Sequence, residues 1–111
     1  MAKPVALRLN KEFKTLYYRG KSQVHPMLVT YLRHNPVGYP RVGITAGKKV
    51  GKAVVRNRTR RIIRAAYQQL LPQIRGGWDI VFVARVKTAT AKSTDIVKVM
   101  QKHLKNGGVL K

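Results

Sequence analysis

One short segment is apolar at almost every position, and it limits how the rest of the chain can fold. Residues 78–84 read Trp-Asp-Ile-Val-Phe-Val-Ala and follow the pair Gly76-Gly77. A run of this length between turn residues is typical of a β-strand, and a strand that is apolar on both sides needs cover on both faces or a place at the centre of a sheet. We therefore expect a sheet built around this segment.

Two further segments alternate as strands do. Residues 24–32 predict a strand interrupted near Pro26. Its two faces carry Leu28, Thr30 and Leu32 on one side, and Met27, Val29 and Tyr31 on the other. Residues 41–46 predict another strand after the turn-rich segment 34–40. These strands are the partners expected for segment 78–84.

Three segments have helical periodicity. Asn10 is expected to cap a helix that Gly20 ends, with Phe13, Leu16 and Tyr17 on one face. A second helix is predicted from about residue 54 to 71, stopped by Pro72. The last should begin at residue 90 or 93, end near 105, and bury a stripe made of Ile96, Val99, Met100, His103 and Leu104. Together these elements predict an α+β fold with helices packed on one sheet, and a single domain spanning residues 1–111.

The charge of the chain indicates a polyanionic partner. Its 111 residues include 24 Lys and Arg but only 3 acids, a formal charge of +21. Like-charge repulsion of this size destabilises a compact state unless an anionic partner relieves it. No apolar run approaches the ~18 residues that span a bilayer, so we expect no membrane partner. The start, residues 1–8, has no long apolar run with a cleavage site and predicts no signal peptide. Cysteine is absent, which is compatible with the cytoplasmic location that we expect.

The densest positive charge falls within the second helix. At about 100° per residue, Arg56, Arg60 and Arg64 line up, with Asn57 and Arg61 beside them, while Arg58 falls outside this arc. The like-charged neighbours cost roughly 1–2 kcal/mol in total, and no acid lies among them to offset it. Arginine forks bind phosphate oxygens in pairs, which favours nucleic-acid binding. The alternative is a solvated face whose charges serve solubility alone.

The same segment resembles a known family. Residues 48–64, KKVGKAVVRNRTRRIIR, are similar to the signature of the bacterial ribonuclease P protein subunit. The resemblance extends to FKTLYYRGK at 13–21, RVGIT at 41–45 and DIVFVAR at 79–85. It covers essentially the whole chain in matching order. It implies an αβββαβα sandwich, with helices on a four-stranded sheet and a left-handed β-α-β crossover, where strand sterics alone would favour a right-handed one.

The resemblance also implies a role and assigns residues to it. The subunit would bind a large catalytic RNA, without needing a protein partner, and assist removal of the 5′ leader from precursor tRNA. Its RNA-binding residues would be Lys48, Lys49, Lys52, Arg56, Asn57, Arg58, Arg60, Arg61 and Arg64. Phe13, Tyr17 and Tyr31 match the aromatic cleft that receives the leader. Tyr17 replaces a common Phe, and Arg60 a common Lys, so stacking and charge are kept.

Each aromatic residue has a plainer interpretation. Phe13 and Tyr17 lie one helical turn apart, and Tyr31 comes from a strand that could pack beside them. Such rings can stack on unpaired bases, each contact being worth about 1–3 kcal/mol whatever the base. The alternative is ordinary core packing, which we assign to Tyr67, Trp78 and Phe82. The resemblance assigns Tyr17 and Tyr31 to the cleft, whereas Phe13 is expected both in the cleft and in the core.

The chain offers few groups for catalysis. Metal-assisted phosphoryl chemistry needs clustered oxygen ligands, yet Glu12, Asp79 and Asp95 fall in three separate elements. We therefore predict no catalytic or metal-binding residue here, and Mg²⁺ held mainly by the RNA subunit and the substrate. One rival is a protein-only ribonuclease that uses a pair among His25, His34 and His103. Another is a structural, for example ribosomal, RNA-binding protein with no part in tRNA processing.

Overall fold

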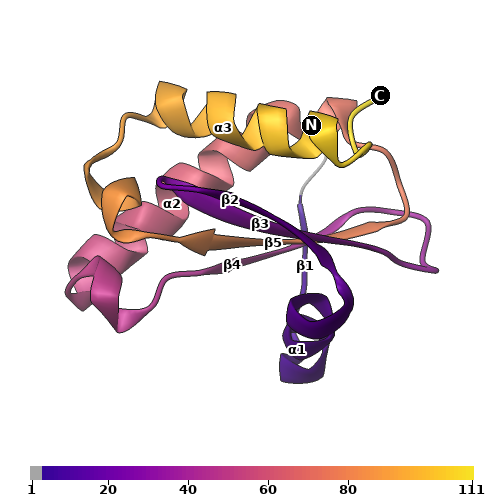
Figure 1. Cartoon of the computed structure of the whole chain (residues 1–111), viewed down its shortest axis with the longest axis horizontal. Coiled ribbons are helices and arrows are strands. Elements are labelled where there is room, and N and C mark those ends of the chain that lie inside the picture. Colours follow the sequence, from indigo (N-terminus) through magenta and orange to yellow (C-terminus); the bar gives the residue numbers. More distant parts are fainter. Residues whose placement is uncertain (1–3) are drawn as a thin grey trace.

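A five-stranded sheet with helices on both faces forms the framework (Figure 1). The computed structural model describes residues 4–111. The strands are β1 (Val5–Ala6), β2 (Lys21–His25), β3 (Leu28–His34), β4 (Arg41–Thr45) and β5 (Trp78–Ala84). The helices are α1 (Asn10–Arg19), α2 (Ala53–Leu70) and α3 (Ser93–Asn106), with short 3-10 helices η1 (Lys48–Val50), η2 (Leu71–Gln73) and η3 (Val86–Thr90). The α+β architecture predicted from the sequence is confirmed.

The apolar segment 78–84 is the middle strand of the sheet. The strand order is β1-β4-β5-β3-β2, so β5 pairs with β4 in parallel and with β3 in antiparallel orientation. Ile80, Val81 and Phe82 are completely buried, although successive side chains face opposite sides of the sheet. Helices therefore contribute cover on both faces, as the sequence predicted.

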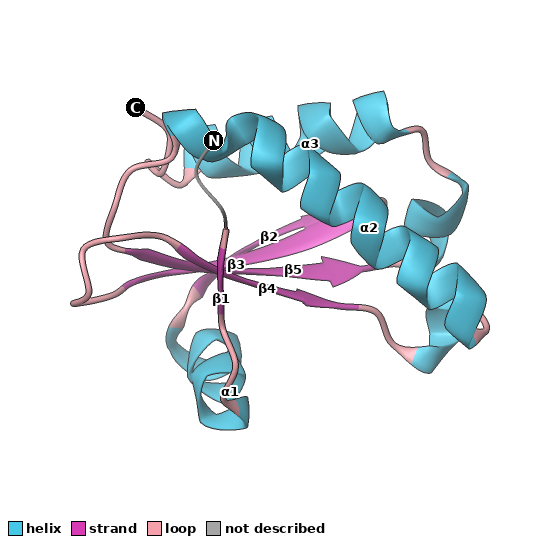
Figure 2. Cartoon of the chain, turned by 180° about the vertical axis from the view of Figure 1, so that it is seen from behind, coloured by secondary structure: helices cyan, strands magenta, loops and turns pink. Residues whose placement is uncertain are grey.

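The helices divide unequally between the two faces (Figure 2). Both α2 and α3 lie on one face, and their apolar sides meet Leu28, Leu32 and Phe82 in the larger core. Helix α1 lies alone on the other face, where Leu16 packs with Leu7 and Val81 in a smaller cluster. The buried residues of α3 follow the predicted stripe, except that Val99 is only partly buried, and α2 buries Thr59, Ile63, Ala66, Tyr67 and Leu70. Tyr67 is thus the core residue that the sequence predicted.

Two expectations about the N-terminal segment were wrong. The sheet has five strands where four were predicted, because residues 5 and 6 pair in parallel with Arg41 and Val42. Two residues are too few to show alternation in a sequence. Asn10 is the first residue of α1 and does not cap it. Glu12 takes that role through its side chain, which accepts hydrogen bonds from the backbone N–H groups of Leu9 and Arg8 at 3.1 and 3.3 Å.

Helix α2 connects the parallel strands β4 and β5, so the β-α-β crossover that the resemblance implies is present, while its hand stays a prediction. Pro72 lies in η2, directly after α2 ends. Within residues 4–111, no helix is both long and apolar enough to cross a membrane. The expectation of no signal peptide rests partly on residues 1–3, which lie outside the described residues.

Candidate RNA-binding surface

The arginines of α2 lie away from its buried side. The helix buries Thr59, Ile63, Ala66, Tyr67 and Leu70 against the larger core. Arg58, Arg61 and Arg64 are exposed, whereas Arg56 and Arg60 are half-buried along the flanks. The ion pairs recorded in residues 4–111 all belong to Arg41, so no carboxylate neutralises the arginines of this helix. Their charge is available to an external anion.

Individual contacts separate these arginines. Arg60 donates from Nη1 to Oδ1 of Asn57 at 2.8 Å, which holds both side chains on one flank. Arg58 turns towards η3 and reaches the carbonyl oxygen of Ala89 at 3.5 Å, in keeping with its predicted place outside the main arc. Nε of Arg56 is buried with no hydrogen-bond partner among the described residues. An unpaired buried donor costs free energy, and a bound phosphate could supply its acceptor.

The lysines before α2 border the face of the sheet that carries α1. Lys48 and Lys49 are exposed on η1, which Val50 anchors in the core, and the exposed Lys52 precedes α2. Lys48 and Lys49 line a cavity of about 420 Å³ together with Val29 and Val83 of the sheet. The motif segment therefore contributes charge to the outside of α2 and to the sheet itself.

Helix α1 runs across the strands and covers one row of the sheet. That row joins Gly43, Val81 and Tyr31 on three neighbouring strands. Gly43 is needed there, because a Cβ atom at this position would collide with the Phe13 ring. The Tyr17 and Tyr31 rings meet edge to face, with centroids 5.0 Å apart. The three predicted cleft aromatics are thus brought to one helix–sheet junction, Phe13 half-buried and Tyr17 41% exposed.

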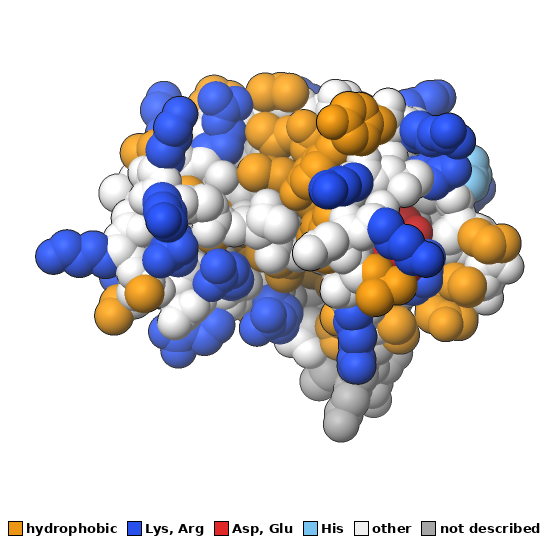
Figure 3. All heavy atoms as spheres, turned by 90° about the horizontal axis from the view of Figure 1, so that it is seen from below, with side chains coloured by type: hydrophobic (Ala, Val, Ile, Leu, Met, Phe, Trp, Pro, Cys, Tyr) orange, Lys and Arg blue, Asp and Glu red, His pale blue; other side chains and the backbone are white. Residues whose placement is uncertain are grey.

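In the described part of the chain, residues 4–111, no helix lies over the next row of the sheet. It joins Thr45, Val83, Val29 and Val24, and it borders the cavity beside Lys48 and Lys49. Val24, at its edge, is 67% exposed. Figure 3 shows apolar side chains gathered in the middle of this side of the molecule, with Lys and Arg around them. We call the surface made by Tyr17, Tyr31 and this uncovered row the open face.

A second cavity lies between α1, β4 and α2. It measures about 280 Å³ and is lined by Phe13 of α1, Gly43 and Ile44 of β4, and Arg64 of α2. Of the three aromatic residues predicted for the leader cleft, Phe13 lines this cavity, whereas Tyr17 and Tyr31 do not. An arginine of α2 and one aromatic side chain of α1 therefore face the same space.

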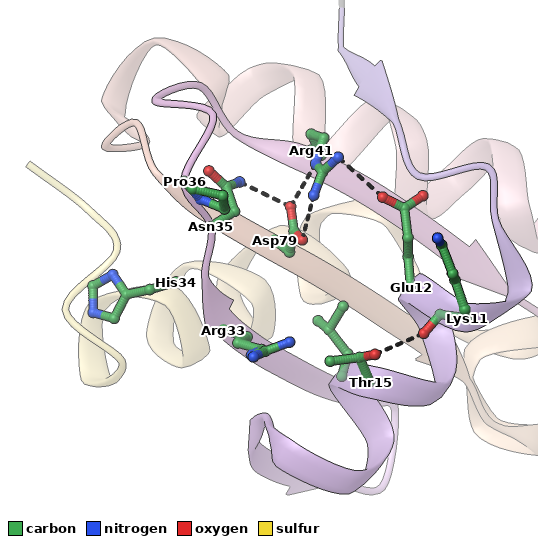
Figure 4. A pocket seen from close by; sticks show the side chains of 10 residues that line it. Lys11, Glu12, Thr15, Arg33, His34, Asn35, Pro36, Arg41 and Asp79 are labelled. Carbon is green, nitrogen blue, oxygen red and sulfur yellow. Dashed lines mark hydrogen bonds and ion pairs between the residues drawn. The ribbon is translucent and has the colours of Figure 1, made fainter.

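An ion-pair network fixes α1 on the sheet (Figure 4). Arg41 of β4 binds both carboxylate oxygens of Asp79 at 2.8 Å and reaches Glu12 of α1 at 3.0 Å. Asn35 donates to the same Asp79 carboxylate at 2.8 Å. The hydrogen bonds to Asp79 raise the pKa of Arg41 further above its usual value. Two of the three acids of the chain are therefore occupied by an arginine, and neither has a free carboxylate for a metal ion.

The histidines proposed by the protein-only alternative have other partners. His25 and His103 lie near each other, with ring centroids 6.4 Å apart. Nδ1 of His103 is 2.8 Å from the Thr30 hydroxyl, inside the larger core, and burial lowers the pKa of His103. Nδ1 of His25 accepts the backbone N–H of Met27 at 3.0 Å. His103 is the packed residue that its place in the helical stripe predicted.

Sequence reasoning did not assign Arg85 and Lys87 to the surface. Arg85 lines the cavity beside Lys48 and Lys49. It also lines a further cavity of about 310 Å³ beside Val24 and Pro26, to which Lys87 contributes as well. Their position carried a usable signal, since basic residues directly after the central strand must emerge at the end of the sheet. No local pattern in the sequence predicted the ion pairs of Arg41, because Glu12 and Asp79 lie 29 and 38 residues away from it in the chain.

Comparison with known proteins gives one family throughout. The family model described as Ribonuclease P matches residues 1–107. The ribonuclease P protein component of Clostridioides difficile (strain 630) is 43% identical over 100 residues, which cover 89% of this chain and 88% of that protein. Among solved structures, the RNase P protein of Staphylococcus aureus superposes with a TM-score of 0.86 at 28% identity, covering 98% of this chain and all of that one. That of Thermotoga maritima gives 0.82 at 30% identity, covering 91% and 96%.

Proposed function

This chain belongs to the ribonuclease P protein family, and from that premise we propose how its surface divides the work of RNA binding. A ribonuclease P protein component acts in tRNA processing within a ribonucleoprotein, so its partner is RNA. In our proposal, the basic side chains of η1 and α2 bind the catalytic RNA. The open face holds the single-stranded 5′ leader of precursor tRNA.

The observation that carries this proposal is the open face itself. A sheet row of three valines and Thr45 lies beside the paired Tyr17 and Tyr31 rings, and no helix within residues 4–111 covers it. Such a surface suits the flat faces of unpaired bases. Lys48 and Lys49 at its border suit the phosphates between those bases. Base stacking and phosphate binding are both nearly independent of sequence, as a protein that accepts many different leaders requires.

The chemical step is proposed to belong to the RNA. Glu12 and Asp79 are bound by Arg41, and residues 4–111 contain no group of three His, Cys, Asp or Glu side chains that could hold a metal ion. We propose that Mg²⁺ is held by phosphates of the catalytic RNA and the substrate. The protein then assists cleavage by holding the leader, which strengthens binding of precursors and equalises it among them.

The test is reconstitution with a bacterial ribonuclease P RNA at low Mg²⁺, with precursor and mature tRNA binding measured side by side. Replacing Tyr31 with Ala should weaken precursor binding about tenfold, the loss expected for one stacked base, and leave mature tRNA unaffected. Tyr18→Ala is the matched control, since Tyr18 lies on α1 beside Tyr17 but is 87% exposed and belongs to neither apolar cluster.

Two results would contradict the proposal. Equal weakening of precursor and mature tRNA by Tyr31→Ala would remove this ring from the leader site. Leader removal that is the same with and without the protein would favour the alternative of a structural RNA-binding protein.

A further inference from the structure

A second cavity that combines aromatic and basic side chains lies outside the site described above. It measures about 160 Å³ and is lined by Arg19, Lys21, Leu32, Arg33, His34 and Trp78. The His34 and Trp78 rings are stacked, with centroids 3.9 Å apart and planes inclined by 32°. Trp78 packs against the larger core, whereas His34 is exposed, so the imidazole forms the outer layer of the stack.

The cavity lies round the edge of the sheet from the open face. Tyr31 and Arg33 of β3 project on the side of α1, while Leu32 and His34 project on the opposite side. Figure 4 shows Arg33 and His34 leaving β3 in different directions. Strand β2 forms this edge, with Ser22 opposite Tyr31 and Lys21 opposite Leu32. A strand of RNA that passes the Tyr31 ring and crosses β2 therefore arrives at Lys21 and the stacked rings.

The chemistry of the cavity suits a nucleotide. Arg19, Lys21 and Arg33 surround it, no carboxylate lines it, and none of the three forms an ion pair within residues 4–111. Arg19 also ends α1, where a cation is favoured by the helix dipole, so its charge has a structural use as well. That use does not explain an exposed imidazole stacked on tryptophan between two further cations. An aromatic face with cations beside it offers a surface for a base and partners for its phosphates.

We propose that this cavity binds an unpaired nucleotide of the precursor leader, upstream of the segment on the open face. The base stacks on His34, and its phosphates meet Arg19 and Lys21. The inference rests on the proposed function, because it extends the path of the same leader. It makes leader length a determinant of affinity, since a short leader ends before it reaches β2.

The experiment compares precursor tRNAs with leaders of increasing length, bound to the reconstituted holoenzyme. With the unchanged protein, affinity should increase as the leader fills the open face, and should increase a second time once the leader is long enough to cross β2. His34→Ala should remove that second rise, about tenfold, and leave binding of short-leader precursors unchanged. His34→Phe should keep it, because a flat ring remains. Lys21→Ala is a second variant, at an exposed side chain that belongs to neither core cluster, and Lys98→Ala on α3 is its control for loss of charge.

The possible failures can be told apart. Long-leader affinity that is unchanged by both His34→Ala and Lys21→Ala would overturn the inference. The inference would also be overturned if these variants bound the catalytic RNA more weakly in the absence of precursor tRNA, because the cavity would then belong to that RNA. Tyr31→Ala measured with a short leader tests the open face independently. A loss there, together with no effect at His34, would leave the proposed function intact and reject only its extension.

Discussion

The two faces of the sheet are built from similar residues and do different work. On one face, α2 and α3 cover most of the strands, and Ile63, Phe82 and Met100 have no exposed surface. On the other, α1 covers one row and leaves Val29 and Val83 beside a cavity. Apolar strands on a small domain thus gain their stability mainly from the covered face, which frees part of the opposite face for a ligand. Neighbouring residues of one strand can therefore differ in role.

Phe82 and Val83 of β5 give the sharpest test of this difference and the largest expected effect. Phe82→Ala should cost about 3–5 kcal/mol of unfolding free energy, because it opens a cavity in the covered core. Val83→Ala should cost about 1 kcal/mol or less, since its side chain is only partly buried on the open face. Urea unfolding of both variants measures the difference. Similar costs for the two would show that the open face is as important for stability as the covered one.

Arg41 tests what keeps α1 on the open face. Arg41→Gln should destabilise the protein by about 2 kcal/mol, because Asp79, which is 7% exposed, loses its paired cation and Glu12 loses its link to the sheet. Hydrogen exchange in α1 should increase more than in α2 or α3. Lys11→Gln on α1 removes a charge without breaking the network and serves as the control. If the control variant lost as much stability, the network would not be what anchors the helix.

Substitutions on the outer side of α2 test whether this helix, which covers the sheet, also binds RNA. Replacing Arg60 and Arg64 together with Ala should weaken binding of the catalytic RNA and flatten its salt dependence. The slope of log affinity against log salt should fall by about 0.7 for each lost contact to single-stranded RNA. The pair Lys98→Ala and Lys102→Ala on α3 removes the same charge from a different surface. An unchanged slope in the α2 variant would argue against direct phosphate contact.

The smallest expected effect is the pH dependence of stability that His103 causes in the core of the covered face. Burial, with His25 and Lys102 nearby, lowers the pKa of His103 from its usual 6.5. The unfolded chain therefore takes up this proton at a higher pH than the folded protein does. Stability should fall as pH drops below about 6.5 towards the lowered pKa, and should not depend on this group at higher pH. His103→Gln should reduce that loss when unfolding is measured at several pH values. A variant with the same acid sensitivity as the parent would contradict this assignment.

The sequence predicted those features that repeat locally. The apolar run 78–84 predicted the central strand, and alternation placed Leu28, Thr30 and Leu32 on one face, which the structure shows to be the buried one. Residues 24–32 were expected to form one strand interrupted near Pro26, but the chain turns back there and they belong to two antiparallel strands, β2 and β3. Helical periodicity separated the arginines of α2 from its core side. It could not predict β1, whose two residues show no period, or the pairing of Arg41 with Asp79 and Glu12. Such contacts join residues far apart in the chain, and only the folded sheet brings them together.

For the candidate site, too, the sequence predicted some features and missed others. Charge and the motif predicted the basic residues, and the resemblance added Phe13, Tyr17 and Tyr31, which do meet at one junction. Neither suggested that the row through Val29 and Val83 would lack a helix, because coverage of a sheet depends on where every other element packs. The His34–Trp78 stack was missed for a related reason, since its rings come from strands that pair across 44 residues.

The most direct test of the account is a photo-cross-linking map of the leader on the reconstituted holoenzyme. Precursor tRNAs carrying a photoreactive base at successive leader positions are irradiated, and the cross-linked peptides are identified. We predict cross-links to the peptides that contain Tyr17, Tyr31 and Val83, on the open face. Cross-links confined to the outer surface of α3, with none on that face, would contradict the claim that the uncovered side of the sheet holds the leader.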